Sequence, residues 1–219
     1  ERHYPEAKES ETPYRSLLNS VIERQALLIA HWMQLGFIHG VMNTDNTTVS
    51  GETIDYGPCA FMDGYESNKT FSSIDHQGRY GFGNQGPIAH WNLARFAETL
   101  VPLLASDTER GVAIAEESLD RFVEIYERAL QRRFKAKIGL GGSAEELDTA
   151  EDKDWAVVRD LLMLMEKGKA DFTLVFRHLV GALESGSDEK VLALFDCTHG
   201  IVALLKAWRA RVSAADVGV

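Results

Sequence analysis

The spacing of apolar residues predicts a mainly helical chain. Over residues 14–35 apolar side chains recur every three or four positions, and Gly36 follows directly. That pattern is typical of an amphipathic helix closed by a glycine C-cap. A similar pattern predicts a helix over 88–104, and Asp107 is placed to N-cap a long helix that runs to about Ile138.

The C-terminal half continues in the same way after a break at 139–143. The acidic stretch 145–154 leads into an expected helix that ends near Lys167. Three more helices are expected: one opens at Asp171 or Thr173 and ends near 183, one is N-capped by Ser187, and one covers 198–212. The chain after residue 88 is therefore expected to be almost entirely helical.

Three segments lack helical periodicity. Residues 1–12 are polar and are expected to form a loop. Residues 47–50 and 52–54 favour two short strands, with Gly51 as the turn of a hairpin. Residues 55–87 are rich in glycine and predict an irregular stretch of about 30 residues, and stretches of that length inside a domain are usually functional.

Oxygen-donor side chains flank the expected hairpin. Asp45 and Asn46 end one loop, and Asp55 opens the next as part of Asp-Tyr-Gly. Two carboxylates and one amide suit a hard cation such as Mg²⁺, with Mn²⁺ as an alternative. These oxygen donors therefore indicate a candidate metal site.

Protein kinases place the same groups in the same order, with a catalytic loop that ends in a metal-binding Asn and a later Asp-Phe-Gly. Residues 39–46 match that loop in length. The third position, which holds the catalytic base in kinases, is Val41, and a valine cannot accept a proton. Asp45 is the obvious substitute for the base.

The resemblance implies a single kinase-like C-lobe over 1–219. Its expected parts are a catalytic loop (39–46), a hairpin (47–54), an Asp-Tyr-Gly and activation-like segment (55–87) and a helical remainder (88–213). Neither a glycine-rich phosphate loop nor a strand lysine precedes residue 39, so the kinase N-lobe is absent from this chain. We therefore expect a fragment that by itself binds ATP weakly or not at all and does not catalyse.

Composition narrows the function classes. The net charge of −10 argues against nucleic acid as a partner. No apolar run approaches the roughly 18 residues of a membrane span, so no membrane association is expected. The two cysteines, Cys59 and Cys197, form no metal or disulfide pattern, and both are expected to be packed side chains. We expect a soluble protein of a reducing compartment, cytoplasmic in a bacterium or mitochondrial in a eukaryote.

Four blocks of sequence together resemble the selenoprotein O family. They are His39-Gly40-Val41-Met42-Asn43-Thr44-Asp45-Asn46, then Gly51-Glu52-Thr53-Ile54-Asp55-Tyr56-Gly57-Pro58-Cys59-Ala60-Phe61, then Asp75-His76-Gln77-Gly78-Arg79-Tyr80, and finally Gly83-Asn84-Gln85 with Trp91-Asn92-Leu93-Ala94-Arg95. The resemblance covers about residues 2–180 and is most specific over 37–95.

That resemblance implies a pseudokinase that is nonetheless an enzyme. Members of the family transfer AMP from ATP to Ser, Thr or Tyr hydroxyl groups of protein substrates. The resemblance implies Asp45 as the proton acceptor, Asn46 and Asp55 as Mg²⁺ ligands, and Asp55 as a residue close to the nucleotide phosphates. ATP and hydroxyl-bearing proteins are then the expected partners.

Alternatives remain open from the sequence. The chain could instead belong to a phosphotransferase with a displaced base, to a non-catalytic nucleotide-binding scaffold, or to a helical interaction domain. His39 is expected to brace its loop by a hydrogen bond. Five residues that resemble the family are expected to brace the core or loops in preference to contacting substrate: Arg79, His90, Trp91, Asn92 and Arg95.

Overall fold

The computed structural model describes residues 2–141 and 152–214 and is mainly helical, as predicted. Its elements, in chain order, are η1 (Pro5–Glu9), α1 (Pro13–Leu35), β1 (Phe37–Ile38), η2 (Thr44–Asn46), β2 (Ala60–Phe61), η3 (Phe82–Asn84), α2 (Gln85–Leu104), α3 (Thr108–Lys137), α4 (Lys153–Gly168), α5 (Phe172–Ser185), α6 (Glu189–Leu192) and α7 (His199–Ala214), where η denotes a 3₁₀ helix. The two strands form one antiparallel sheet.

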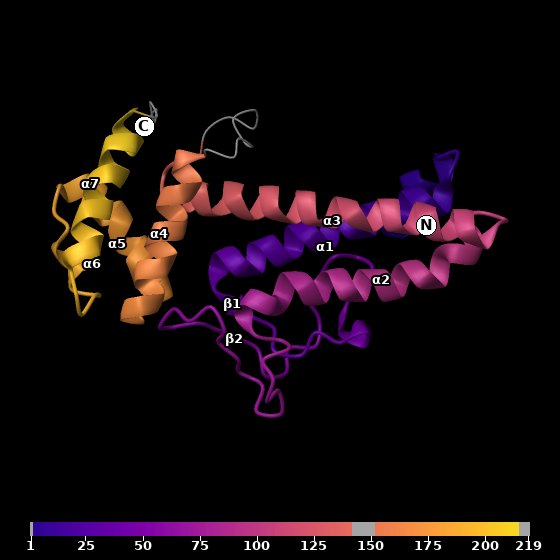
Figure 1. Ribbon diagram of the computed structural model, residues 1–219, viewed down its shortest axis with the longest axis horizontal. Helices are drawn as coiled ribbons and strands as arrows, with labels where there is room; N and C mark the ends of the chain where they lie inside the picture. Colours follow the sequence, from indigo (N-terminus) through magenta and orange to yellow (C-terminus); the bar gives the residue numbers. More distant parts are fainter. Residues whose placement is uncertain (1, 142–151, 215–219) are drawn as a thin grey trace.

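The helices form two groups (Figure 1). Helices α1, α2 and α3 pack on one another along the long axis of the molecule, and α4 to α7 gather at the end where α3 finishes. The irregular segments between the two strands and after β2 lie beneath α1 and α2 in this view. Within the described residues, no helix is both long and apolar enough to cross a membrane.

The predicted helices are confirmed wherever the structure describes them, and so are the caps at Gly36, Asp107 and Asp171, whereas the N-cap of α6 is Asp188 and not the expected Ser187. Gly36 ends α1 in the left-handed conformation, with φ of 70°. The carboxylates of Asp107 and Asp171 accept hydrogen bonds from backbone N–H groups in the first turns of α3 and α5. Helix α2 begins at Gln85, earlier than the expected residue 88. Most of the acidic stretch 145–154 lies outside the described residues.

The predicted hairpin over 47–54 is wrong. Neither half forms a strand, and the two-stranded sheet instead pairs Phe37 with Phe61 and Ile38 with Ala60. The turn at Gly51 does exist, with φ of 73°. It is closed by the Thr48 hydroxyl group, which bonds both the N–H and the carbonyl of Glu52, at 3.1 and 2.9 Å. A side chain thus replaces the strand partner that the pattern suggested.

The N-terminal segment is also more ordered than its polarity suggested. Residues 5–9 form a 3₁₀ helix, and Tyr4 and Ala7 are buried. The ring of Tyr4 lies under the guanidinium of Arg24 at 4.5 Å, and its hydroxyl donates to the carbonyl of Val49. Because one tyrosine fills a core position, a mostly polar segment packs against α1.

The activation-like segment is fastened at several points. Near its start, the N–H of Tyr65 donates to Ala170 at 2.9 Å, and the N–H of Phe172 donates back to Asp63 at 2.7 Å. The 67–83 loop that follows is closed at its base, where the N–H of Gly83 donates to Ser67 at 2.8 Å. The segment before α2 is therefore irregular in conformation but extensively hydrogen-bonded.

One aromatic residue joins the two helical groups. Phe172, at the start of α5, is fully buried, and its ring lies against the backbone of Gly36 at the end of α1. The ammonium group of Lys137, at the end of α3, lies 4.3 Å from the centre of this ring and 4.1 Å from that of Phe176. It also donates to the carbonyl of Gln34, so a cation satisfies the C-terminus of α1.

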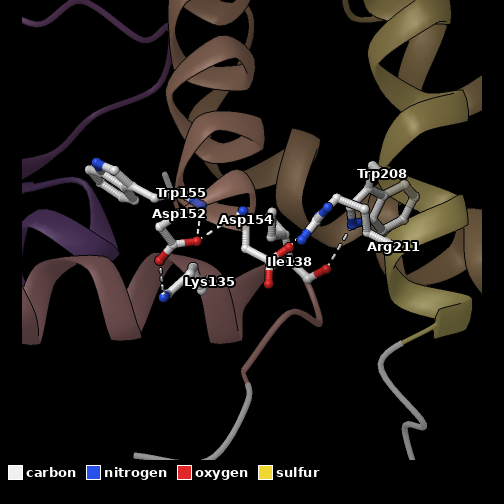
Figure 2. Close-up of polar contacts among 7 residues, drawn as sticks. All are labelled: Lys135, Ile138, Asp152, Asp154, Trp155, Trp208 and Arg211. Atoms are coloured by element: carbon white, nitrogen blue, oxygen red, sulfur yellow. Dashed lines mark hydrogen bonds and ion pairs between the residues drawn. The ribbon is translucent and has the colours of Figure 1, made fainter. Parts of the chain in front are cut away.

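A second junction fixes α4 and α7 to the end of α3 (Figure 2). Lys135 donates to Asp152 at 2.6 Å, and the other carboxylate oxygen of Asp152 accepts from the N–H of Asp154 at 2.9 Å and of Trp155 at 3.0 Å. Burial raises the pKa of Asp152, but the bonds from Lys135 and the backbone outweigh it and leave the pKa below its ordinary value. The indole N–H of Trp208 donates to the carbonyl of Ile138, the residue directly after α3, at 2.7 Å.

We predict that Gly36→Ala destabilises the fold more than Gly186→Ala. Both glycines are left-handed helix C-caps, with φ of 70° and 72°, so both changes strain the backbone by about 1 kcal/mol. A Cβ at residue 36 would also lie 2.7 Å from Cδ1 of Phe172, whereas nothing lies within 4 Å at residue 186. Overpacking should add about 1–3 kcal/mol at Gly36. Urea unfolding followed by circular dichroism measures both, and equal losses would contradict the contact with Phe172.

A second prediction concerns Lys137, since burial lowers its pKa to about 8. Below pH 8 the amine is protonated in both the folded and unfolded chain. Between pH 8 and about 10.4 the unfolded chain keeps a proton that the folded protein has lost, so stability rises with pH. Relative to Lys137→Met, the wild-type free energy of unfolding should rise by about 1–2 kcal/mol from pH 7.5 to 9.5, after allowance for partial exposure. A constant difference would show that the two rings keep the amine protonated.

Candidate active site

His39 connects the catalytic-like loop to the segment that precedes Asp55. Its imidazole is fully buried, and Nε2 lies 2.7 Å from the carbonyl oxygen of Ile54. The Nδ1 atom accepts from the N–H of Val41 at 3.4 Å. This pattern assigns the proton to Nε2, which donates to Ile54. The expectation that His39 braces the loop is confirmed.

Two buried amides of α2 hold the same loop from the other side. The side chain of Gln85 accepts from the N–H of His39 and donates to the carbonyl of Phe37, both at 3.0 Å. The side chain of Asn92 donates to the carbonyl of Met42 at 2.9 Å and to the hydroxyl of Thr47 at 3.0 Å. Residues 85 and 92 are two helical turns apart, so one face of α2 supports the loop along its length.

Of these two amides, the sequence pointed to only one. Asn92 was expected to brace a loop or the core, and it does. The role of Gln85 was not predicted. The sequence did carry a signal for it, since a polar residue at the first turn of an apolar helix face needs a buried hydrogen-bond partner. Which backbone groups it would bond was not readable without the tertiary structure.

Asp45 and Asn46 lie together in the single turn of η2. The amide Nδ2 of Asn46 donates to the carbonyl of Val41 at 3.1 Å, which leaves its Oδ1 as an acceptor without a donor among the described residues. Asp45 is exposed, and its carboxylate accepts from the amide of Asn43 at 2.5 Å. The sequence neighbours Asp45 and Asn46 therefore have different hydrogen-bond partners.

Asp55 stands in an unusual backbone conformation. Its φ of 55° is left-handed, which costs about 1 kcal/mol or more for a residue other than glycine, although Asp tolerates it better than most. Its carbonyl accepts from the N–H of Gly57 at 2.8 Å. The side chain is exposed, and within the described residues its carboxylate has no hydrogen-bond or ion-pair partner. The structure thus presents a free carboxylate on a locally strained turn.

A continuous path of hydrogen bonds links the two candidate ligands. It runs from the Asn46 amide to the carbonyl of Val41, from the N–H of Val41 to the His39 ring, and from that ring to Ile54, the residue before Asp55. The structure therefore couples the loop that carries Asn46 to the turn that carries Asp55 through one buried imidazole.

The donor chemistry of this pair fits a magnesium ion. Mg²⁺ prefers oxygen ligands and commonly takes one or two from the protein, with water and phosphate oxygens completing its coordination. Asn46 Oδ1 and the Asp55 carboxylate supply such oxygens and have no other partners among the described residues. No cluster of three or more His, Cys, Asp or Glu side chains suited to a metal occurs in the part of the chain that the structure describes. The residues therefore fit an ion whose coordination is completed by water and phosphate oxygens better than an ion that is held by protein ligands alone.

Two hollows flank the catalytic-like loop. One, of about 470 Å³, lies between the loop and α2 and is lined by Val21, Thr44, Thr47, Thr48, Val49, Trp91, Asn92, Leu93, Arg95, Phe96 and Thr99. The other, of about 510 Å³, lies between the loop and the activation-like segment and is lined by Val41, Asn43, Ser72, Ile74, Asp75, His76, Gln77, Arg79 and Tyr80. Val41, which stands where kinases carry their base, faces the second hollow.

The cysteines play no visible part in this site. Cys59 is partly buried against the core, as expected. Cys197 is exposed, so the expectation that it belongs to the core is wrong. It lies in the connection between α6 and α7, where the chain turns at the surface and apolar neighbours in sequence do not enforce burial.

Comparison with known proteins identifies the relatives of this chain. A family model described as protein adenylyltransferase SelO matches residues 1–214. Curated relatives named protein nucleotidyltransferase YdiU include one from Rhodopseudomonas palustris (strain HaA2), 52% identical over 213 residues. Others come from Rhizobium meliloti (strain 1021), 48% identical over 212 residues, and Alkaliphilus metalliredigens (strain QYMF), 48% identical over 213 residues.

These matches cover nearly all of this chain but less than half of each relative. The three alignments span 97%, 96% and 97% of the chain and 42%, 42% and 41% of the respective relatives. The part that is shared contains the whole catalytic-like loop, the Asp-Tyr-Gly turn and the helices that support them. From the family model and these relatives together, the chain belongs to the SelO family.

Proposed function

We propose that this chain carries the metal-binding and base residues of a protein adenylyltransferase that moves AMP from ATP to Ser, Thr or Tyr hydroxyl groups. The observation that carries the proposal is the path of hydrogen bonds through His39, which couples the partner-free oxygens of Asn46 and Asp55. Membership of the SelO family supports the adenylyl group as the one transferred. The kinase-like C-lobe arrangement is part of the same proposal.

In this reading Asn46 Oδ1 and the Asp55 carboxylate hold Mg²⁺, or Mn²⁺ in its place. The bound ion supplies charge neutralisation at the phosphate oxygens of ATP. His39 restricts the relative movement of the two ligand-bearing turns, since its ring bonds the backbone on both sides. A ligand pair held in this way loses little freedom on binding, which favours correct positioning of the nucleotide.

Asp45 is the proposed proton acceptor. The oxygen of the acceptor hydroxyl forms a bond to the α-phosphorus, the bond from that phosphorus to the bridging oxygen of the β-phosphate breaks, and pyrophosphate leaves. The hydroxyl proton passes to the Asp45 carboxylate, which is exposed and oriented by the amide of Asn43. Val41 offers no group for this step.

The position of a radiolabel tests which group is transferred. With the whole protein that contains these residues, Mg²⁺ and a mixture of acceptor proteins, label at the α-phosphate of ATP should enter protein and label at the γ-phosphate should not. Incorporation from the γ-position alone would identify a phosphotransferase with a displaced base. No incorporation from either, with folded protein, would favour a non-catalytic nucleotide-binding scaffold.

Carboxylate-to-amide variants test the assigned roles. Asp45→Asn should lower kcat by about 10²–10⁴-fold with little change in metal affinity, because it removes the base alone. Asp55→Asn should lower activity and also raise the Mg²⁺ concentration needed for half-maximal rate by about tenfold or more. Asp120→Asn, an exposed carboxylate on α3, is the matched control and should leave both quantities unchanged. Equal metal dependence for Asp45→Asn and Asp55→Asn would contradict the division of roles.

A further inference from the structure

The hollow between the catalytic-like loop and residues 72–80, here called the 72–80 hollow, begins beside the proposed base. Asn43 lines it, and the amide of Asn43 contacts the carboxylate of Asp45. The proposed metal ligands Asn46 and Asp55 do not line it. Through Asn43, the 72–80 hollow therefore adjoins the proposed base, and it is not lined by the proposed metal ligands.

Arg79, which lines this hollow, has no counter-ion among the described residues. The guanidinium of Arg79 lies 5.8 Å from the ring centre of Tyr80 and 5.0 Å from that of Trp91. These contacts place the guanidinium but leave its charge unneutralised. Among the residues that the structure describes, Arg79 makes no ion pair, although the chain as a whole carries a net charge of −10.

The one acid that lines the 72–80 hollow is already engaged. Asp75 accepts from the backbone N–H of Arg79 at 2.9 Å through one oxygen and from that of Tyr80 at 2.8 Å through the other. Its carboxylate thus shapes the turn that presents Arg79 and does not pair with the side chain of that arginine. The exposed guanidinium of Arg79 is therefore accessible to a carboxylate of another molecule.

A neighbouring arginine provides an internal contrast. Arg95 lies on Trp91 as well, at 5.2 Å from the ring centre, but its guanidinium pairs with Glu98 at 2.6 Å. It lines the other hollow, on the α2 side of the loop. Of the two arginines stacked on one indole, only Arg79 faces the 72–80 hollow with its charge unpaired.

From this arrangement we propose that the 72–80 hollow receives the substrate segment that carries the hydroxyl, and that Arg79 selects a segment with a carboxylate close to that hydroxyl. Charge-assisted bonds between guanidinium and carboxylate give such a contact direction as well as attraction. Ile74, 81% exposed at the rim, offers an apolar contact for the same segment. The inference rests on the proposed function, since it requires a hydroxyl-bearing protein substrate.

Paired peptides test the preference. Each pair contains a single Ser or Tyr flanked by Asp in one peptide and by Asn in the other, and transfer is measured with the whole protein, Mg²⁺ and α-labelled ATP. The Asp peptide should react with a kcat/KM about three- to tenfold higher, the range expected for a partly exposed charge-assisted contact. Arg79→Gln should abolish the preference and leave the KM for ATP unchanged, while Arg79→Lys should keep part of it.

Arg95→Gln is the matched control, because it removes one charge from the same indole outside the hollow, and it should retain the preference. Equal rates for the two peptides with wild-type protein would overturn the inference, as would an equal loss of preference in both glutamine variants. So would a raised KM for ATP in Arg79→Gln with the preference intact, which would assign Arg79 to the nucleotide. Absence of α-label transfer to any acceptor overturns the proposed function itself, whereas transfer without a preference overturns this inference alone.

Discussion

Buried side chains, not strand pairing, satisfy the backbone of the loops that form the candidate site. A buried N–H or carbonyl without a partner costs about as much as a lost hydrogen bond, so an irregular segment beneath two helices needs partners from elsewhere. Gln85 and Asn92 supply them from α2, and His39 supplies them from within the loop. Everything proposed for Asn46 and Asp55 depends on these bonds, because no regular element holds either residue apart from one 3₁₀ turn.

The helices were predictable because their signals are local. The apolar period of α1, the left-handed Gly36 and the capping carboxylates of Asp107 and Asp171 all act within a few residues of where they stand. The prediction of the hairpin was wrong because its signals are also local. A Gly between Thr-rich halves predicts a turn, and the turn formed, but Thr48 closed it with its own hydroxyl. The strand that pairs with β1 is β2, which follows the Asp-Tyr-Gly turn, and the local sequence pattern there does not predict a strand.

The candidate site, too, could be predicted from the sequence only in part. The order of Asn46 and Asp55 along the chain, and the missing base at Val41, could be read from residue identities. The coupling of those residues through a buried imidazole could not, since it depends on where α2 packs and on the tautomer that the surrounding bonds impose. The unpaired state of Arg79 was likewise hidden, because it follows from the engagement of Asp75 with backbone N–H groups.

The closed base of the 67–83 loop separates the conformation of that loop from the conformation of the turns around His39. The N–H of Gly83 donates to Ser67 at 2.8 Å, and the N–H of Phe82 donates to Lys69 at 2.9 Å. Because these two bonds close the loop, changes within it need not alter the turns around His39. Lengthening such a loop adds little closure entropy, so insertions are tolerated. The 67–83 loop can therefore change in length or composition while the turns that carry Asn46 and Asp55 keep their conformation, because the hydrogen bonds that hold those turns all lie outside the loop.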